Sequence, residues 1–427
     1  MVIFILVELM VVAVHSTLVL SDRAHSIQTI HNKPPLRFHR EDESSSETTT
    51  TKTKNTTKYF FTILQLADIH LGENAWEDWG PEQDRKTFGA LQSILRAEQP
   101  DLIIFSGDQL TANNINDNAT EYIDLLAQHI APFDIPWAMI FGNHDDAPLE
   151  RSTNDNNGVI YHSAKTSRRR LVQADAQHTL SLTQIGPSEL PGVSNYWLDI
   201  VYETSRPGQN KEADHSLGTS NNDVIGARIL LLDSGGGSLE QRIDESHIQW
   251  FHQTNHQHAD IPVIAFQHIP STLADFSFSE SRCRSGGGGG NDTSLAEDGV
   301  APLEYDGGIV QALRVAGNVH ILAVGHNHGN DYCCRLPGES VGNNDDYEEK
   351  SFSSSMSPNL LHLCFGRHSG YGGYGSWDRG ARVYRLQLAV ATENDKSSSG
   401  TVVPSFSWMS YVRMESDEVI HLYNPYG

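Results

Sequence analysis

Five short motifs, each placed directly after an apolar run, constrain this chain more than any other feature of its sequence. In chain order they are Asp68-Ile69-His70, Gly107-Asp108, Gly142-Asn143-His144-Asp145, His268 and Gly325-His326-Asn327-His328. The preceding runs are rich in aliphatic and aromatic residues, which favours buried strands. In open α/β sheets, sites form outside the carboxyl ends of the strands. We therefore expect an α/β fold in which the five motifs meet.

The apolar runs alternate with helical patterns in the first part of the chain. Strands are predicted at 59–66, 101–105, 135–141, 261–266 and 319–324, and later ones near 196–202, 227–232, 360–365, 381–388 and 402–414. Residues 81–98 and 119–130 have the apolar spacing of amphipathic helices. The alternation of strand and helix between residues 59 and 141 implies parallel strands with right-handed crossovers.

The residue types in the motifs are those of a site for two metal ions. Carboxylate, imidazole and amide oxygen ligands suit borderline ions such as Zn, Mn or Fe. Two close cations repel each other, so a bridging carboxylate is needed, and Asp108 is the candidate. Each motif alone also fits a turn or a structural histidine. Together they predict a dinuclear centre that clamps an in-line displacement at phosphorus.

The ordered set resembles the calcineurin-like metallophosphoesterase superfamily, whose pattern is D-x-H, GD, GNH followed by D or E, a lone H, and GHxH. The similarity extends from about residue 60 to about residue 388, and it is strongest to the short purple acid phosphatase-like branch of plants, fungi and algae. His268-Ile269-Pro270, Asn330-Asp331-Tyr332-Cys333 and residues 364–383 support this assignment. The resemblance implies an α/β fold of the four-layer α-β-β-α type, with the metal site at the carboxyl ends of the strands.

Carried over motif by motif, the resemblance also implies a role for each site residue. One metal would be held by Asp68, His70, Asp108 and His328, and the other by Asp108, Asn143, His268 and His326. His144 would lie beside the attacked phosphate as transition-state stabiliser and general acid, oriented by Asp145. The identity of the metal pair among Fe, Zn and Mn stays open.

Two departures from the family pattern affect these expectations. Purple acid phosphatases carry a metal-binding Tyr three residues after the bridging Asp, and this chain has Thr111 there. We therefore expect no purple chromophore. In the late glycine-rich segment a family His near Gly372 is missing, while Arg367 and His368 stand earlier. That segment is expected to border the substrate pocket and to alter specificity.

The reaction class leaves the substrate open. The main hypothesis is hydrolysis of phosphate monoesters, carried by small molecules or phosphoproteins. The alternatives are hydrolysis of phosphodiesters or nucleotides on the same fold, and a catalytically silent binding relative. The oligomeric state is left open by the sequence.

The charge balance argues against a nucleic acid partner. The chain has a formal net charge of −24, whereas phosphate-backbone binders cluster Lys and Arg. Only the arginines at 168–170 stand out, and we interpret them as a solvated loop or a processing site. An acidic surface does not exclude an anionic substrate, because bound metals dominate the local charge.

The remaining segments predict a secretory route. Residues 1–22 form an apolar signal peptide or, alternatively, an uncleaved signal anchor. The protein would accordingly be secreted or vacuolar, or anchored in a membrane by a single pass. Asn55, Asn118 and Asn291 begin N-x-T sequons. Residues 23–57 are predicted to be a disordered Ser/Thr-rich linker, and residues 58–427 a phosphoesterase domain with insertions near 150–190, 204–223, 277–300 and 338–357.

Four cysteines suit one or two disulfides in an oxidising compartment. Adjacent cysteines rarely bond each other, and we expect that one of the two, Cys333 or Cys334, pairs with Cys364. Buried free thiols are the alternative.

Overall fold

The computed structural model describes a large part of the chain. The described residues are 33, 35–41, 56–74, 77–115, 119–152, 159–162, 165–204, 223–272, 283, 296–336, 361–391 and 404–426. They belong almost entirely to a compact unit made of Leu36–Tyr202 and Ile225–Gly427; the second unit is Met1–Pro35 and Glu203–Val224. The predicted N-terminal segment 1–22, the three sequons and most of the insertions at 204–223, 277–300 and 338–357 lie outside the described residues. Every described helix is too short or too polar to span a bilayer.

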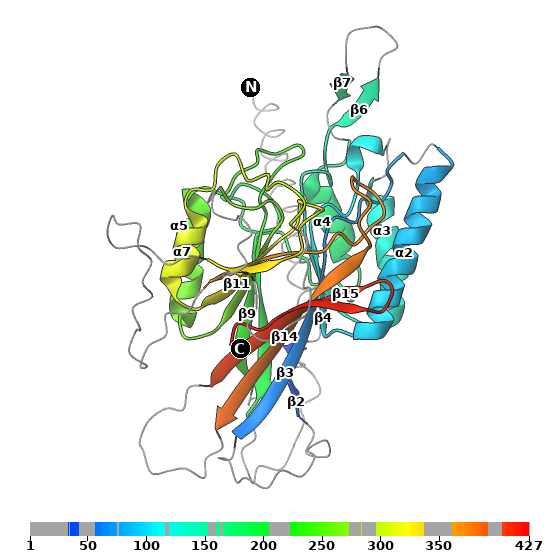
Figure 1. Ribbon diagram of the computed structural model, residues 1–427. Helices are drawn as coiled ribbons and strands as arrows, with labels where there is room; N and C mark the ends of the chain where they lie inside the picture. The colour runs from blue at the N-terminus through cyan, green and yellow to red at the C-terminus, as the bar shows by residue number, and fades with distance from the viewer. Residues whose placement is uncertain are drawn as a thin grey trace, which may run out of the picture. The chain divides into compact units, whose positions relative to one another are not determined.

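Two mixed β-sheets form the centre of the compact unit (Figure 1). In spatial order the first sheet contains β1 (Leu36–Arg37), β8 (Tyr196–Glu203), β9 (Asp223–Leu232), β10 (Val263–Gln267), β11 (Val319–Val324), β13 (His362–Phe365) and β12 (Cys333–Arg335). The second contains β16 (Val419–Tyr423), β15 (Ser405–Met414), β14 (Gly380–Ala391), β3 (Thr56–Leu66), β4 (Leu102–Ser106) and β5 (Trp137–Ile140), with β2 (His39–Arg40) paired to β3. A separate hairpin joins β6 (Leu149–Ser152) to β7 (Val159–His162).

The strands that precede the five motifs run parallel within each sheet. β3 pairs parallel with β4, and β4 with β5, as the strand and helix alternation predicts. In the other sheet β10 lies parallel to both β9 and β11. Parallel neighbours have their carboxyl ends at the same side of the sheet, so the motif residues of each sheet are gathered at one edge.

Helices cover the outer face of each sheet. The second sheet packs against α2 (Trp79–Glu98), α3 (Ala119–Ile130) and α4 (Arg168–Ala176). The first sheet packs against α5 (Glu245–Asn255) and α7 (Ile309–Ala316). Figure 1 shows α5 and α7 on one side and α2, α3 and α4 on the other, with the strands between them. The predicted four-layer α-β-β-α fold is confirmed.

A single apolar core joins the two sheets. It contains Phe61, Ile63 and Ile104 from the second sheet and Ile229 and Phe266 from the first. Successive side chains of a strand point to opposite faces. The alternate residues of β3 and β4 therefore pack outward, against α2 and α3. Burial on both faces explains why these strands are continuous apolar runs in the sequence.

The predicted linker 23–57 contains structure that the sequence did not indicate. Within it, Leu36–Arg37 forms β1 and His39–Arg40 forms β2, and the side chains of Leu36 and Phe38 are buried. β1 pairs with β8 and β2 with β3, so this short segment adds to both sheets. The prediction of disorder is wrong for these residues, because pairing to strands far along the chain stabilises a segment too short to fold alone.

Two disulfides lie beside the last motif. Cys333 pairs with Cys364, which confirms one of the two expected pairings, and Cys283 pairs with Cys334. Cys333 and Cys364 lie opposite each other on the antiparallel strands β12 and β13. Neighbouring residues on a strand face opposite ways, so Cys334 meets a different partner from Cys333.

Candidate metal centre

The five motifs meet between the edges of the two sheets. β3, β4 and β5 of the second sheet lead to Asp68, Asp108 and Asn143, and β10 and β11 of the first lead to His268 and His326. The site therefore depends on how one sheet packs against the other. Backbone hydrogen bonds join the first two motif loops directly, since the N–H groups of Ile69 and His70 both donate to the carbonyl of Asp108.

One group of ligand atoms comprises Asp68, His70 and His328, which we call the first half-site. All three side chains are buried, and each offers an atom within 4.8 Å of the others. Nε2 of His70 lies 3.2 Å from Nε2 of His328, which lies 3.6 Å from Oδ1 of Asp68. Two ring nitrogens and a carboxylate oxygen that converge in this way fit one divalent cation between them.

A second group comprises Asp108, His268 and His326, which with Asn143 we call the second half-site. Its ligand atoms also lie within 4.8 Å of one another. Oδ2 of Asp108 is 3.1 Å from Nε2 of His268 and 3.8 Å from Nε2 of His70. The Asp108 carboxylate therefore lies between the two half-sites, as a bridging ligand requires.

Four of these residues have a backbone conformation that side chains rarely adopt. The φ angles are 56° for Asp68, 54° for His70, 53° for Asp108 and 74° for His326. Left-handed φ at a non-glycine residue is uncommon and costs on the order of 1 kcal/mol or more. Strain of this kind concentrates at functional sites because the surrounding structure must hold it in place. Its coincidence with the ligand positions supports their functional role.

Three ligand imidazoles are oriented through their second ring nitrogen. Nδ1 of His268 donates to the carbonyl of Ser106 at 3.0 Å, and Nδ1 of His328 donates to the carbonyl of Tyr374 at 2.8 Å. Nδ1 of His70 lies 3.1 Å from the hydroxyl of Thr111. Such partners fix the tautomer and direct Nε2 toward the metal. Thr111, where purple acid phosphatases place a tyrosine ligand, thus supports a histidine.

The protonation of the site suits cation binding. Burial lowers the pKa of His70 well below its ordinary value and that of His326 to about 3, so both rings are neutral ligands. Burial would also lower the pKa of His268, but the adjacent Asp108 carboxylate raises it to about 9. Burial would raise the pKa of Asp108, yet His268 and its neighbours bring it well below the ordinary value. Without a metal, Asp108 and His268 therefore form a neutral ion pair, and a metal ion at Nε2 of His268 would take the place of its proton.

An unsatisfied acceptor supports the same conclusion. Oδ1 of Asn143 is buried, and none of the described residues donates a hydrogen bond to it. Buried polar atoms without partners are uncommon in folded proteins. An amide oxygen beside carboxylate and imidazole groups is a suitable ligand for a borderline metal. The residues of both half-sites therefore fit a pair of metal ions.

His144 and Asp145 differ in what they contact. The His144 ring is partly exposed, its centroid lies 5.0 Å from that of His70, and its backbone N–H donates to Oδ1 of Asp108 at 2.7 Å. The Asp145 carboxylate is fully buried and accepts from the backbone N–H groups of Asp108, Leu110 and Gly142. Asp145 therefore holds two ligand loops together, and the prediction that it orients the His144 ring is not supported by these contacts.

The interpretation of the arginines at 168–170 is wrong for Arg168. Arg168 is neither in a solvated loop nor available for processing, since it begins α4 and is 1% exposed. In the late glycine-rich segment, Arg367 and His368 are buried, and a contribution of this segment to the substrate pocket stays a prediction. The His368 ring packs 4.0 Å from that of His328. Tyr374 of the same segment is half-exposed, and its ring stacks on that of His328, also at 4.0 Å.

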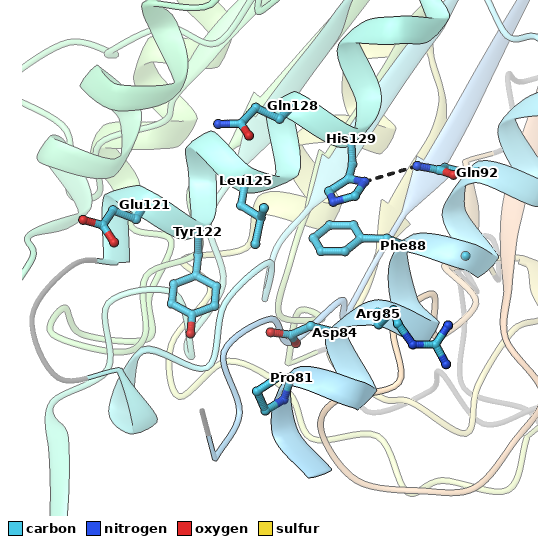
Figure 2. Close-up of a pocket in the computed structure, with 11 residues that line it drawn as sticks. Pro81, Asp84, Arg85, Phe88, Gln92, Glu121, Tyr122, Leu125, Gln128 and His129 are labelled. Carbon is cyan, nitrogen blue, oxygen red and sulfur yellow. Dashed lines mark hydrogen bonds between the residues drawn. The ribbon is translucent and has the colours of Figure 1, made fainter. Parts of the chain in front are cut away.

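A separate hollow of about 740 Å³ lies between α2 and α3 (Figure 2). Phe88 and Leu125 form part of its wall, and the Phe88 ring stacks on His129 at 3.8 Å. Its connection to the metal centre is Asp84, whose carboxylate accepts from the backbone N–H of Gly72, two residues after His70. Asp84 therefore anchors the loop of the first half-site to α2.

The fold and the paired ligand clusters define a metallophosphoesterase class of protein. A family model described as calcineurin-like phosphoesterase matches residues 61–330 of this chain. The chain belongs to that family.

The sequence identity to individual relatives is low. The chain is 27% identical over 380 residues to "Probable inactive purple acid phosphatase 29" of Arabidopsis thaliana, covering 82% of this chain and 81% of the relative. It is 28% identical over 389 residues to "Phosphatase DCR2" of Saccharomyces cerevisiae, covering 84% and 57% respectively. Among solved structures, a dimetal phosphatase from Danio rerio aligns with a TM-score of 0.41 at 12% identity, over 85% of this chain and 97% of that one.

Proposed function

We propose that this protein is a dinuclear metal-dependent hydrolase of phosphate monoesters. The observation that carries the proposal is the position of Asp108, whose carboxylate lies between two clusters of buried metal-ligating side chains. Paired cations with a shared carboxylate suit attack of water on phosphorus better than a structural metal site does.

The proposed ligands follow the two half-sites. One metal would be held by Asp68, His70, Asp108 and His328, and the other by Asp108, Asn143, His268 and His326. The metals are drawn from Fe, Zn and Mn, which suit this donor set. When bound, such a pair lowers the pKa of water and stabilises the phosphoryl oxygens.

His144 is the proposed catalytic side chain. Its ring is partly exposed and lies next to His70, and its Nδ1 has no hydrogen-bond partner among the described residues. An imidazole beside the centre whose Nδ1 has no competing hydrogen bond can stabilise charge on the phosphate or protonate the leaving oxygen. General acid catalysis of this kind contributes about 10²- to 10⁴-fold.

The names of the relatives raise the question of whether this protein has phosphatase activity. Three plant relatives carry the words "Probable inactive", whereas the yeast relative is named a phosphatase. In this chain the seven proposed ligands and His144 are all present, with strained backbone and supported imidazoles at the ligand positions. Retention of these costly features favours an active enzyme over a silent binding relative.

The experiment is phosphate release from a generic aryl phosphate by the metal-reconstituted protein, with Asp108→Asn as the inactive control. We expect turnover by the wild type, its loss in Asp108→Asn, and loss of both metals in that variant, measured by elemental analysis. A bis-aryl phosphodiester is assayed in parallel. Faster hydrolysis of the diester would replace the monoesterase proposal by a phosphodiesterase. Two bound metals without turnover of either ester would support a silent relative.

Entry into the secretory pathway is proposed from the apolar segment 1–22 and the sequons. Two disulfides are compatible with an oxidising compartment. Treatment of the expressed protein with an endoglycosidase, followed by its apparent mass on a gel, tests this. An unchanged mass, together with an intact N-terminus in the cell fraction, would contradict the secreted form.

A further inference from the structure

Arg168 is a fully buried cation that the proposed reaction does not use. It begins α4, and its side chain is 1% exposed. Nη1 donates to Oδ1 of Asp233 at 2.5 Å, and Nη2 donates to Oδ1 of Asp146 at 2.8 Å. A buried arginine is expensive to desolvate and is retained only where its charge and its hydrogen bonds are matched.

The same guanidinium also binds the loop that carries Asn143. Nη2 of Arg168 donates to the carbonyl of Gly142 at 2.6 Å and to the carbonyl of Gly236 at 3.1 Å, and Nη1 donates to the carbonyl of Gly235 at 3.3 Å. Gly142 directly precedes Asn143. One side chain therefore joins the ligand loop after β5 to the glycine turn after β9, which lies in the other sheet.

The glycine turn is packed tightly against that loop. Gly236 has a φ of 89°, and a Cβ there would collide with the side chain of Asn143; a Cβ at Gly237 would collide with Asp146. The backbone of the turn therefore touches the ligand loop directly. The position of the Asn143 amide therefore depends on the contact between the ligand loop and the glycine turn. Arg168 donates hydrogen bonds to both of these segments.

The charges explain why an arginine is required. Asp146 and Asp233 are both fully buried, and Arg168 is the cation that pairs with each of them. Those two carboxylates and Arg168 have a net charge of −1, so removing the guanidinium would leave two buried anions close together. Lysine would preserve the charge but not the planar fork that reaches carboxylates and carbonyls together.

We infer that Arg168 is a positioning residue that sets the affinity of the second half-site for its metal. The inference rests on the proposed dinuclear function and deepens it. Arg168 acts by holding the Gly142–Asn143 backbone, and thereby the Asn143 amide oxygen, at the distance that the metal requires. Residues that orient metal ligands in this way typically change metal affinity by about 10- to 100-fold when substituted.

The test is titration of chelator-treated protein with Zn²⁺, followed by calorimetry. Wild type and Arg169→Gln are expected to bind two Zn²⁺ ions with the same affinities. Arg169 is the matched control because it is the next residue of α4 and is exposed. Arg168→Lys is expected to bind one Zn²⁺ normally and the other about 10- to 100-fold more weakly.

A second set of measurements, in the His70→Ala variant, identifies which half-site is weakened by Arg168→Lys. His70→Ala disables the first half-site, so the ion that remains is the one held by the second. Arg168→Lys in this background should weaken that remaining ion by the same factor. Asp146→Asn, which keeps the shape of the cluster, is expected to have a smaller effect in the same direction and provides a variant should Arg168→Lys fail to fold.

Each outcome distinguishes the two proposals. Unchanged Zn²⁺ affinities in Arg168→Lys and Asp146→Asn would overturn the role of Arg168. Equal weakening of both ions, with a lowered melting temperature, would also overturn it, since it would show a general structural role. A wild type that takes up fewer than two Zn²⁺ ions would instead overturn the dinuclear proposal, and the inference with it.

Discussion

The metal-ligating side chains of the two half-sites are held in position by different kinds of contact. In the first, the imidazole of His328 lies between the rings of Tyr374 and His368, and the polar partners are the Thr111 hydroxyl and the Tyr374 carbonyl, which are neutral. In the second, His268 also has a neutral partner, the Ser106 carbonyl, but the ligand loops are held by the buried Asp145 side chain and by the ion cluster of Arg168.

The difference shows what each type of support can do. Ring packing and neutral acceptors fix the direction of a side chain at small electrostatic cost. Buried charges form stronger hydrogen bonds, and can hold several backbone segments at once, but they cost much more when one partner is lost. We therefore expect the second half-site to be more sensitive to substitution than the first.

The largest effect is expected for Asp145→Ala. The substitution leaves the backbone N–H groups of Asp108, Leu110 and Gly142 without their buried acceptor. Each unsatisfied group costs about 1–3 kcal/mol, so for three groups we expect the free energy of unfolding to fall by about 3–9 kcal/mol. Urea denaturation measures it, with the exposed Asp260→Ala as control. A loss below 1 kcal/mol would break the comparison, since the second half-site would then not depend on the buried side chain of Asp145.

The next effect concerns Asp84, whose buried carboxyl group accepts from the backbone N–H of Gly72 near the first half-site. Burial raises the pKa of Asp84 to about 6, so the folded protein favours the protonated carboxyl. The stability from that preference is fully present below about pH 4, declines between pH 4 and 6, and is absent above. Asn cannot ionise, so Asp84→Asn should be more stable at pH 8 by about 2–3 kcal/mol, with the difference shrinking toward pH 4.

Thermal unfolding of both proteins across pH 4–8 measures this difference. The neighbouring Arg85 is exposed, and Arg85→Gln should show no such pH dependence. A stability difference between Asp84→Asn and wild type that is constant with pH would mean that the carboxyl of Asp84 is already ionised at low pH.

A smaller effect is expected for Thr111→Val. Valine preserves the shape of the side chain but removes the hydroxyl beside Nδ1 of His70. Affinity for one Zn²⁺ ion should fall about 10-fold, while the ion weakened by Arg168→Lys keeps its affinity. Weakening of the same ion by both variants would show that the half-sites are not independently supported.

The smallest effect is expected for Tyr374→Phe. The hydroxyl accepts from the backbone N–H of His328 at 3.1 Å and donates to Asp298, but the stacked ring and the backbone carbonyl are retained. Stability and Zn²⁺ affinity should change by about 1 kcal/mol or less. Tyr374→Ala, which also removes the ring, should weaken the first half-site more. Equal effects of Phe and Ala would assign the contribution to the hydroxyl and not to ring packing.

Strand and helix positions were largely predictable from the sequence. The predicted helix 119–130 and strand 319–324 coincide with α3 and β11, and the boundaries of the other predicted elements differ by a few residues, whereas α4, α7, β12 and β16 were not predicted. The periodicity of apolar residues predicts such elements well because each helix or strand buries one of its faces. β1 and β2 were not predictable, since these two-residue strands exist only through pairing to distant strands.

The candidate ligands could be named from the motifs, but their supports could not. Thr111 lies three residues after Asp108, at the position where purple acid phosphatases carry a tyrosine. Arg168 stood in an arginine cluster that suggested solvent. Neither residue carries a local signal for its partner, because each partner is supplied by a different loop.

By itself the sequence determined which side chains are available for metal binding and that each follows a strand, because ligand type and strand pattern are local properties of the chain. Only the tertiary structure decided that ligands from two separate sheets converge around Asp108, that Asp145 braces loops, and that Arg168 is buried. Those outcomes depend on packing one sheet against the other, where desolvation makes each charge either paired or costly. Contacts of that kind join residues far apart in the chain and leave no periodic trace in it.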